Sequence, residues 1–267
     1  MAIRKIFNFL MAIFLFSWPI FGVPQSETAG QDLSSLMAKA AEYCHRLTRS
    51  VMDFTCREQV KEWIGPGDLS SARNWFYDYQ LIRKNGSIRE NRILLNDNGR
   101  EVNTANAPLQ TQTFSYAYVV MGPLGLLSRV SQAKNDFRIV REEKVGGETA
   151  IVIEAAPKPG ARLDHLFGTV WVRKADARIL KIEWNPSSMD NYAGIEAYAK
   201  ENGLKPKITM TSEYGFEKNG IFFPSHYTIK EDYVGGNRSK RLIHRSQVDV
   251  TYDRYKFFTV ETEVNFK

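Results

Sequence analysis

The sequence has 267 residues, of which 43% are hydrophobic and 25% charged, and a formal net charge of +6 at pH 7. So mild a charge balance gives no support to a nucleic-acid-binding protein, which needs a dense basic patch. The length suits one domain with a sizeable hydrophobic core, and two domains are not required.

The chain begins with the pattern of an export signal. Arg4 and Lys5 precede residues 6–22, an uncharged stretch dominated by Phe, Ile, Leu and Met. This order is typical of a signal peptide. We therefore predict a signal over residues 1–22, cleaved somewhere in residues 22–29, and a periplasmic or secreted product. The alternative is an uncleaved membrane anchor, for which the stretch is barely long enough.

The next predicted elements are a helix and a strand. Apolar residues recur at helical spacing from Leu33 to Val51, and from Phe54 to Ile64 the pattern changes to alternation. Cys44 and Cys56 are the only cysteines, and an even number in an exported chain favours a disulfide between them. One continuous helix would hold them about 18 Å apart, so the chain must reverse between them. The alternative, a redox pair, lacks C-x-x-C spacing.

Most of the remaining chain is predicted as β-hairpins. Turn sequences such as Asn-Gly and Gly-Gly separate runs in which apolar and polar residues alternate. Sequential hairpins pair antiparallel, which gives about eleven strands in all. The predicted strand pairs are 75–83 with 88–95, 137–145 with 148–155, 168–174 with 179–184, 207–216 with 221–231, and 241–252 with 257–266.

Two helical segments interrupt these strands. Pro123 suits the first position of a helix over 122–133, while Gly203 and Pro206 follow a second helix over 189–201. Residues 95–121, by contrast, are loop-like. So few helices cannot cover so many strands unless the sheet curves or encloses a ligand.

We therefore predict a single α+β domain over residues 31–267. Its sheet is mainly antiparallel and strongly curved, or forms an incomplete β-barrel, with helices covering the concave face. Strand parity makes one face of this sheet strongly apolar and aromatic, and its residues are the candidate ligand-binding set. They are Trp75, Tyr77, Tyr79, Leu81, Val170, Val172, Leu180, Ile182 and Trp184.

Catalytic and metal-binding patterns are missing from the sequence. It contains no G-x-S-x-G, H-E-x-x-H, P-loop or G-x-G-x-x-G motif. The four histidines are isolated from one another, and the adjacent pair Asp164 and His165 has no further partner nearby in the sequence. We predict no catalytic residue, no metal and no cofactor.

Two segments resemble the LolA/LolB-like superfamily of periplasmic lipoprotein carriers. Residues 168–184, in which strands flank Ala175-Asp176-Ala177, are similar to the family's unit of strand, acidic turn and strand. Residues 218–224, Lys-Asn-Gly-Ile-Phe-Phe-Pro, resemble its late hairpin. The order of elements agrees over most of the mature chain. The resemblance implies an incomplete β-barrel whose concave apolar surface, under a helical lid, holds an acyl chain or a protein partner.

These observations predict a non-enzymatic periplasmic binding protein. Its expected ligand is a lipid, a lipoprotein or another hydrophobic molecule. The alternative is an envelope interaction or sensor module, with an envelope protein as partner and a groove filled by its own side chains. The binding protein requires an open cavity, whereas the interaction or sensor module has a packed one. An enzyme is the third reading, and it would need distant carboxylates to gather around Asp164 and His165.

Overall fold

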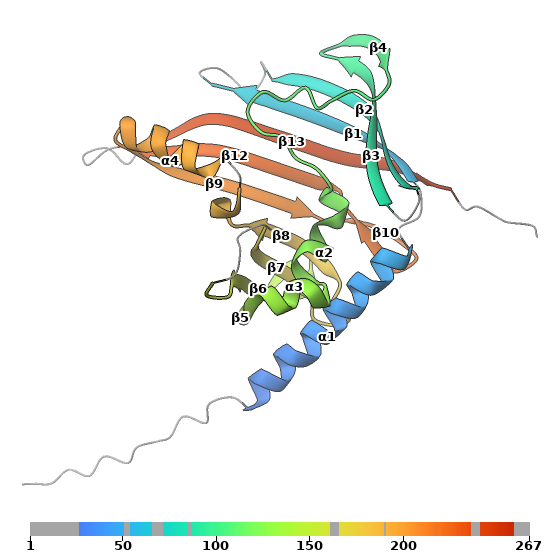
Figure 1. Ribbon diagram of the computed structural model, residues 1–267, viewed down its shortest axis with the longest axis vertical. Coiled ribbons are helices and arrows are strands. Elements are labelled where there is room, and N and C mark those ends of the chain that lie inside the picture. Colours follow the sequence, from blue (N-terminus) through green and yellow to red (C-terminus); the bar gives the residue numbers. More distant parts are fainter. Residues whose placement is uncertain are drawn as a thin grey trace, which may run out of the picture.

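The computed structural model describes residues 27–50, 54–65, 72–84, 87–160, 166–189, 191–235 and 241–258 (Figure 1). The predicted signal over residues 1–22 lies outside this part of the chain. No helix within it combines the length and the hydropathy that crossing a membrane requires. The helices are α1 (Glu27–Ser50), η2 (Val119–Met121), α2 (Gly122–Leu127), α3 (Arg129–Lys134), η3 (Pro186–Ser188) and α4 (Tyr192–Glu201). The strands are β1 (Phe54–Ile64), β2 (Arg73–Lys84), β3 (Ser87–Asp97), β4 (Arg100–Thr104), β5 (Asn135–Val145), β6 (Glu148–Pro157), β7 (Gly168–Arg173), β8 (Ile179–Trp184), β9 (Leu204–Glu213), β10 (Phe216–Lys218), β11 (Ile221–Phe223), β12 (His226–Gly235) and β13 (Leu242–Phe257).

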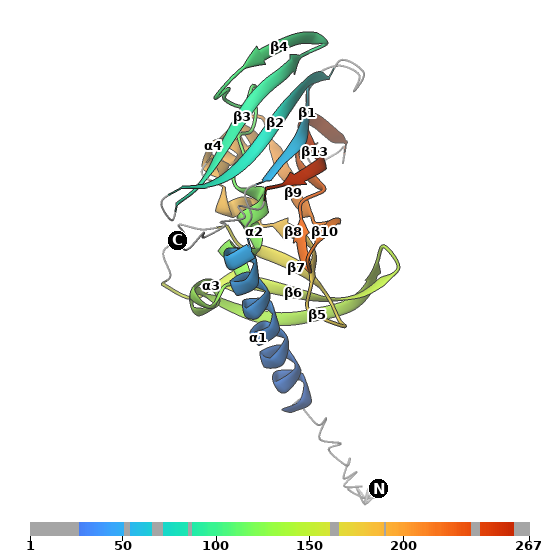
Figure 2. The ribbon, with the colours of Figure 1, turned by 90° about the vertical axis from the view of Figure 1, so that its right-hand side faces the viewer.

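One antiparallel sheet of eleven strands forms the body of the molecule. Its order is β4-β3-β2-β1-β13-β12-β9-β8-β7-β6-β5, so β4 and β5 are edges and the sheet does not close. Figure 2 shows that the sheet curves, with α1, α2 and α3 on its concave side. The predicted α+β class and the incomplete barrel are confirmed.

Glycine-containing turns close two of the predicted hairpins. Gly146 and Gly147 join β5 to β6 at φ values of 57° and 86°. Asn219 and Gly220 join β10 to β11 at 54° and 73°. Two successive positive φ values give a turn whose twist matches that of the flanking strands, and Gly and Asn adopt them most easily.

The hydrophobic core lies on the concave face. Inward-facing side chains of the central strands pack there against one face of α1, whose buried residues follow helical spacing. Tyr43 of α1 fixes the helix to β11, because its hydroxyl donates to the Phe222 carbonyl at 3.3 Å and accepts from the Phe222 amide at 3.1 Å. The buried face of α1 consists of Leu36, Met37, Ala40, Ala41, Tyr43, Cys44 and Leu47.

A helix and a strand are among the predicted elements that differ from the structure. The helix predicted over 122–133 is broken at Ser128, whose backbone is extended and whose hydroxyl accepts the Ser131 amide, so that it ends α2 and caps α3. Residues 241–252 belong to one long strand, β13, which continues to Phe257 and pairs with both β12 and β1. Most of the last predicted strand, 257–266, lies outside the described residues.

The predicted disulfide between Cys44 and Cys56 is wrong for this structure, in which both cysteines are free and buried. Cys44 precedes the end of α1 by six residues, about 9 Å along the helix axis. Its thiol donates to the Pro123 carbonyl at 3.4 Å, whereas the Cys56 thiol contacts the Tyr255 hydroxyl. Reversal of the chain alone therefore does not bring the two sulfurs together. Burial raises the pKa of Cys44 to about 12.

Candidate functional site

An extended segment crosses the concave face between β4 and α2. This segment, residues 107–118, is called the strap, and it belongs to no helix or strand (Figure 1). Its backbone bonds instead to groups of the sheet: the Ala107 amide donates to the Arg92 carbonyl at 2.9 Å, and the Gln110 amide to the Tyr77 hydroxyl at 3.1 Å. The strap is therefore held by individual hydrogen bonds across several strands.

Buried carboxylates of the sheet supply the strongest of these bonds. Glu62 of β1 accepts the amides of Gln112 and Thr113 at 2.9 and 2.8 Å and the Thr113 hydroxyl at 2.7 Å. Glu90 of β3 accepts the Tyr118 amide at 2.6 Å. Hydrogen bonds to ionised groups are about twice as strong as those between neutral groups. These two carboxylates therefore fix both halves of the strap over the sheet.

A third carboxylate lies in an ion pair beneath the strap. Glu58 of β1, fully buried, bonds to the Arg92 guanidinium of β3 at 2.6 and 3.1 Å, and it accepts the Tyr116 hydroxyl at 3.0 Å. The guanidinium lies 5.0 Å from the Tyr79 ring centroid and 5.6 Å from that of Tyr116. Burial, together with the charge of Glu58, raises the pKa of Tyr116 well above its ordinary value. Tyr116 thus remains a neutral donor.

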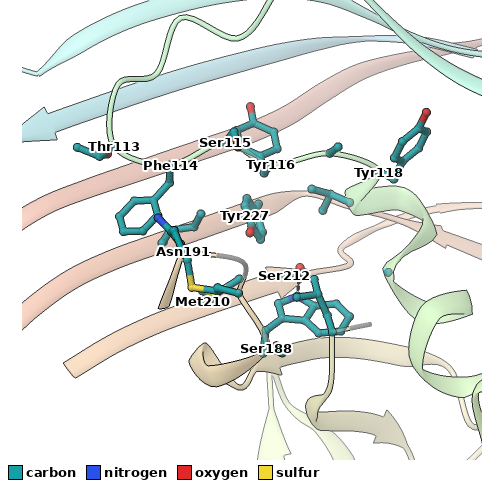
Figure 3. Close-up of a pocket in the computed structure, with 17 residues that line it drawn as sticks. Thr113, Phe114, Ser115, Tyr116, Tyr118, Ser188, Asn191, Met210, Ser212 and Tyr227 are labelled. Carbon is teal, nitrogen blue, oxygen red and sulfur yellow. Dashed lines mark hydrogen bonds between the residues drawn. The ribbon is translucent and has the colours of Figure 1, made fainter. Parts of the chain in front are cut away.

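A cavity of about 530 Å³ opens between the strap and the sheet (Figure 3). The strap and η2 form one wall, and β8, β9 and β12 with the segment around η3 form the others. Its lining is mixed, with aromatic and thioether side chains beside hydroxyl groups. The lining residues are Thr113, Phe114, Ser115, Tyr116, Ala117, Tyr118, Val119, Gly122, Leu166, Trp184, Ser188, Met189, Asn191, Met210, Ser212, Tyr227 and Ile229.

Several polar atoms of this lining are already bonded. The Trp184 indole nitrogen donates to the Ser212 hydroxyl at 2.8 Å, and the Tyr214 hydroxyl beside it donates to the Val119 carbonyl at 3.1 Å. Gly122 lies so near that a Cβ there would come within 2.7 Å of the Tyr214 hydroxyl and 3.0 Å of the Trp184 ring. The cavity wall is therefore close-packed around Gly122.

Of the predicted ligand-binding residues, the structure places only Trp184 in the cavity lining. Tyr77 and Tyr79 lie beneath the strap, where their hydroxyls bond to the Gln110 amide and to Glu90. The Trp75 indole donates to Asp97 at 2.9 Å. These residues are packed core, as are the others of the predicted set apart from Leu180: Leu81, Val170, Val172 and Ile182.

Leu180 faces the opposite side of the sheet. The pairing of β7 with β8 shifts at this point, because Trp171 pairs with Lys181 while Val172 pairs with Ile179. The extra residue of this bulge is Leu180, which packs on the convex face against Trp171. A bulge changes the side of the sheet to which the residues before it point. Ile179 therefore faces inward, whereas simple alternation along the strand predicts that Leu180 does.

Most of the lining residues come from parts of the sequence that strand parity did not identify. The strap carries Phe114, Tyr116 and Tyr118 at alternate positions, and such alternation is the signal of an extended segment with one buried face. Phe114 and Tyr116 are buried as this pattern requires, whereas Tyr118 is exposed. Met210 and Ser212 of β9, and Tyr227 and Ile229 of β12, show the same alternation.

The cavity offers little for catalysis. Among the described lining residues there is no His, Cys, Lys, Arg, Asp or Glu, so none of these supplies a base beside a lining serine. Among the described residues no group of His, Cys, Asp and Glu side chains could hold a metal ion. The pair Asp164 and His165 lies outside the part of the chain that the structure describes.

By sequence, no protein family model and no curated protein matches the chain. Solved structures are similar to it. A domain from Vibrio parahaemolyticus, named for outer membrane lipoprotein sorting, is 11% identical over 84% of this chain and 93% of its own, with a TM-score of 0.44. A LolA superfamily protein from Nitrosomonas europaea is 13% identical over 86% and 97%, with a TM-score of 0.37. A DUF1329 family protein from Desulfovibrio piger is 10% identical over 88% and 97%, with a TM-score of 0.42.

All three similarities have low sequence identity and low TM-scores. At this level of similarity, what the cavity can hold depends on this chain's own residues.

Proposed function

We propose that this protein is a non-enzymatic binding protein for a hydrophobic ligand, which it holds between the strap and the concave face of the sheet. The observation that carries this proposal is the cavity of about 530 Å³ beside the hydrophobic core. Pockets for small ligands typically measure about 300–1,000 Å³ and combine an apolar lining with a few polar groups. In this cavity, whose lining is mixed, the apolar part comes from Phe114, Trp184, Met189, Met210 and Ile229.

Binding of a neutral fluorescent naphthylamine probe tests this function. We expect the wild-type protein to bind the probe, and Met210→Trp to weaken binding because the larger side chain occupies part of the cavity. Lys207→Trp is the matched control, since Lys207 is exposed and lies on the opposite face of the same strand. An interaction or sensor module with no ligand would be the better account if the wild type bound no probe.

The dependence of affinity on the length of the ligand gives a second test of the same cavity. Linear alcohols of ten to fourteen carbons should displace the probe more strongly as they lengthen. Each buried methylene contributes about 0.8 kcal/mol, or roughly a fourfold gain in affinity. Competition titrations measure this slope directly. A flat series would contradict burial of the alkyl chain.

The proposal places the protein outside the cytoplasm, because residues 1–22 have the pattern of an export signal. When the chain is made in an exporting host, we expect the mature product to begin between residues 23 and 30. Intact mass of the exported protein measures this start. A mass that retains residues 1–22 would instead indicate a protein anchored at its N-terminus.

A further inference from the structure

Tyr227 of β12 combines burial with a place in the cavity lining. Its side chain is only 5% exposed, it lines the cavity, and its ring lies 5.2 Å from that of Tyr116. Figure 3 shows it between the strap and Met210 and Ser212. Among the described residues, no hydrogen-bond partner is found for its hydroxyl. Five other inward-facing tyrosines bond to protein atoms, namely Tyr77, Tyr79, Tyr116, Tyr214 and Tyr233. Among the described residues the hydroxyl of Tyr252 also has no partner, but Tyr252 is not a residue of the cavity lining.

Tyr227 is a buried residue, and the hydroxyls of buried tyrosines usually find an acceptor. The Tyr227 side chain lines the cavity, so a bound molecule can supply this acceptor. Burial raises the pKa of Tyr227, which keeps the phenol protonated and able to donate. The polar part of a ligand is therefore expected beside this hydroxyl.

The charges around the cavity restrict the nature of that polar part. Among the lining residues that the structure describes, none is a Lys, Arg or His that could pair with an anion. Behind the strap lie three carboxylates, Glu58, Glu62 and Glu90, against the single guanidinium of Arg92. An anionic head group would thus be buried without a counter-charge and near an excess of negative charge, which is strongly unfavourable.

We propose that the cavity selects a neutral amphiphile, a long-chain alcohol or an acyl ester, whose oxygen accepts a hydrogen bond from the Tyr227 hydroxyl, over the corresponding fatty acid anion. This inference rests on the proposed function, and it specifies the ligand class of the same site. The apolar lining holds the alkyl chain, Tyr227 bonds to the head group, and the charge distribution excludes carboxylates.

Competition for the naphthylamine probe at pH 8 tests the selection. We expect hexadecanol and methyl palmitate, below their aggregation limits, to displace the probe at least tenfold more strongly than palmitate. Tyr227→Phe should weaken both neutral competitors about fivefold to tenfold, the usual effect of one lost hydrogen bond, when each is compared with the probe affinity measured for the same variant. Tyr255→Phe is the matched control, because it removes a buried hydroxyl that donates to the Pro224 carbonyl away from the cavity.

The possible failures are distinguishable. If the wild-type protein binds no probe, the proposed function is overturned and this inference with it. If the probe binds and palmitate displaces it as strongly as hexadecanol, the charge selection alone is overturned. If Tyr227→Phe retains full affinity for both neutral competitors while remaining folded, Tyr227 does not bind the head group.

Discussion

Replacing Arg92 with methionine should lower the free energy of unfolding by about 3–5 kcal/mol, the usual cost of leaving a buried charge without its partner. Arg92 is the counter-charge of Glu58, which is fully buried, and of Glu90, whose side chain is 8% exposed. Methionine keeps much of the side-chain volume but supplies no donor. Urea unfolding at pH 7, followed by circular dichroism, measures the loss.

Arg57→Met is the matched control for this experiment. Arg57 also bonds to a carboxylate with two nitrogens, but it and its partner Asp253 are 34% and 42% exposed. Exposed ion pairs contribute about 0–1 kcal/mol because water and salt screen them. Equal losses in the two variants would show that the Glu58 site is not desolvated as the structure indicates.

A double variant separates the missing charge from the missing packing. In Arg92→Met with Glu58→Gln, the amide oxygen can still accept the Tyr116 hydroxyl, and no unpaired charge remains at that position. We expect this protein to recover part of the stability that Arg92→Met loses. If the double variant is no more stable than Arg92→Met, the loss comes from packing against the Tyr79 and Tyr116 rings instead.

Local sequence patterns predicted the hairpins well, because turn chemistry acts over a few residues. Gly146-Gly147 and Asn219-Gly220 adopt the positive φ values that their residue types favour, and the flanking strands pair as expected. The change from helical to alternating spacing likewise placed α1 before β1. Local rules, however, do not determine which hairpins lie side by side. In the structure β13 pairs with β1, nearly two hundred residues earlier in the chain.

The site was predicted less well, for two physical reasons. The strap is held by side-chain carboxylates, so its backbone shows no strand pairing and no turn sequence that a pattern search would detect. Alternation along a strand also identifies the residues that face inward, but it does not show whether another segment of the chain covers them. Tyr77 and Tyr79 face inward as predicted, yet the strap fills the space above them, and the open space lies over β9 and β12.

The Tyr79→Ala variant should show most clearly whether Tyr79 is a core residue or a contact of the ligand. We expect it to lower the free energy of unfolding by about 3–5 kcal/mol, because the lost ring leaves a void in a close-packed core. Probe affinity of the folded fraction should remain unchanged, since Tyr79 lies beneath the strap and is not among the lining residues. Urea unfolding and probe titration at a temperature where the variant is folded measure the two quantities on one sample.

Tyr79→Phe divides this effect into its ring and hydroxyl parts. The Tyr79 hydroxyl donates to Glu90 at 2.6 Å, and Glu90 also accepts the Tyr118 amide of the strap. Loss of a hydrogen bond to a charged group costs about 1.5–3 kcal/mol, so phenylalanine should cost less than alanine and keep the core filled. The opposite result, a stable Tyr79→Ala protein that no longer binds the probe, would make Tyr79 a ligand contact, because a packed core residue cannot be removed without loss of stability.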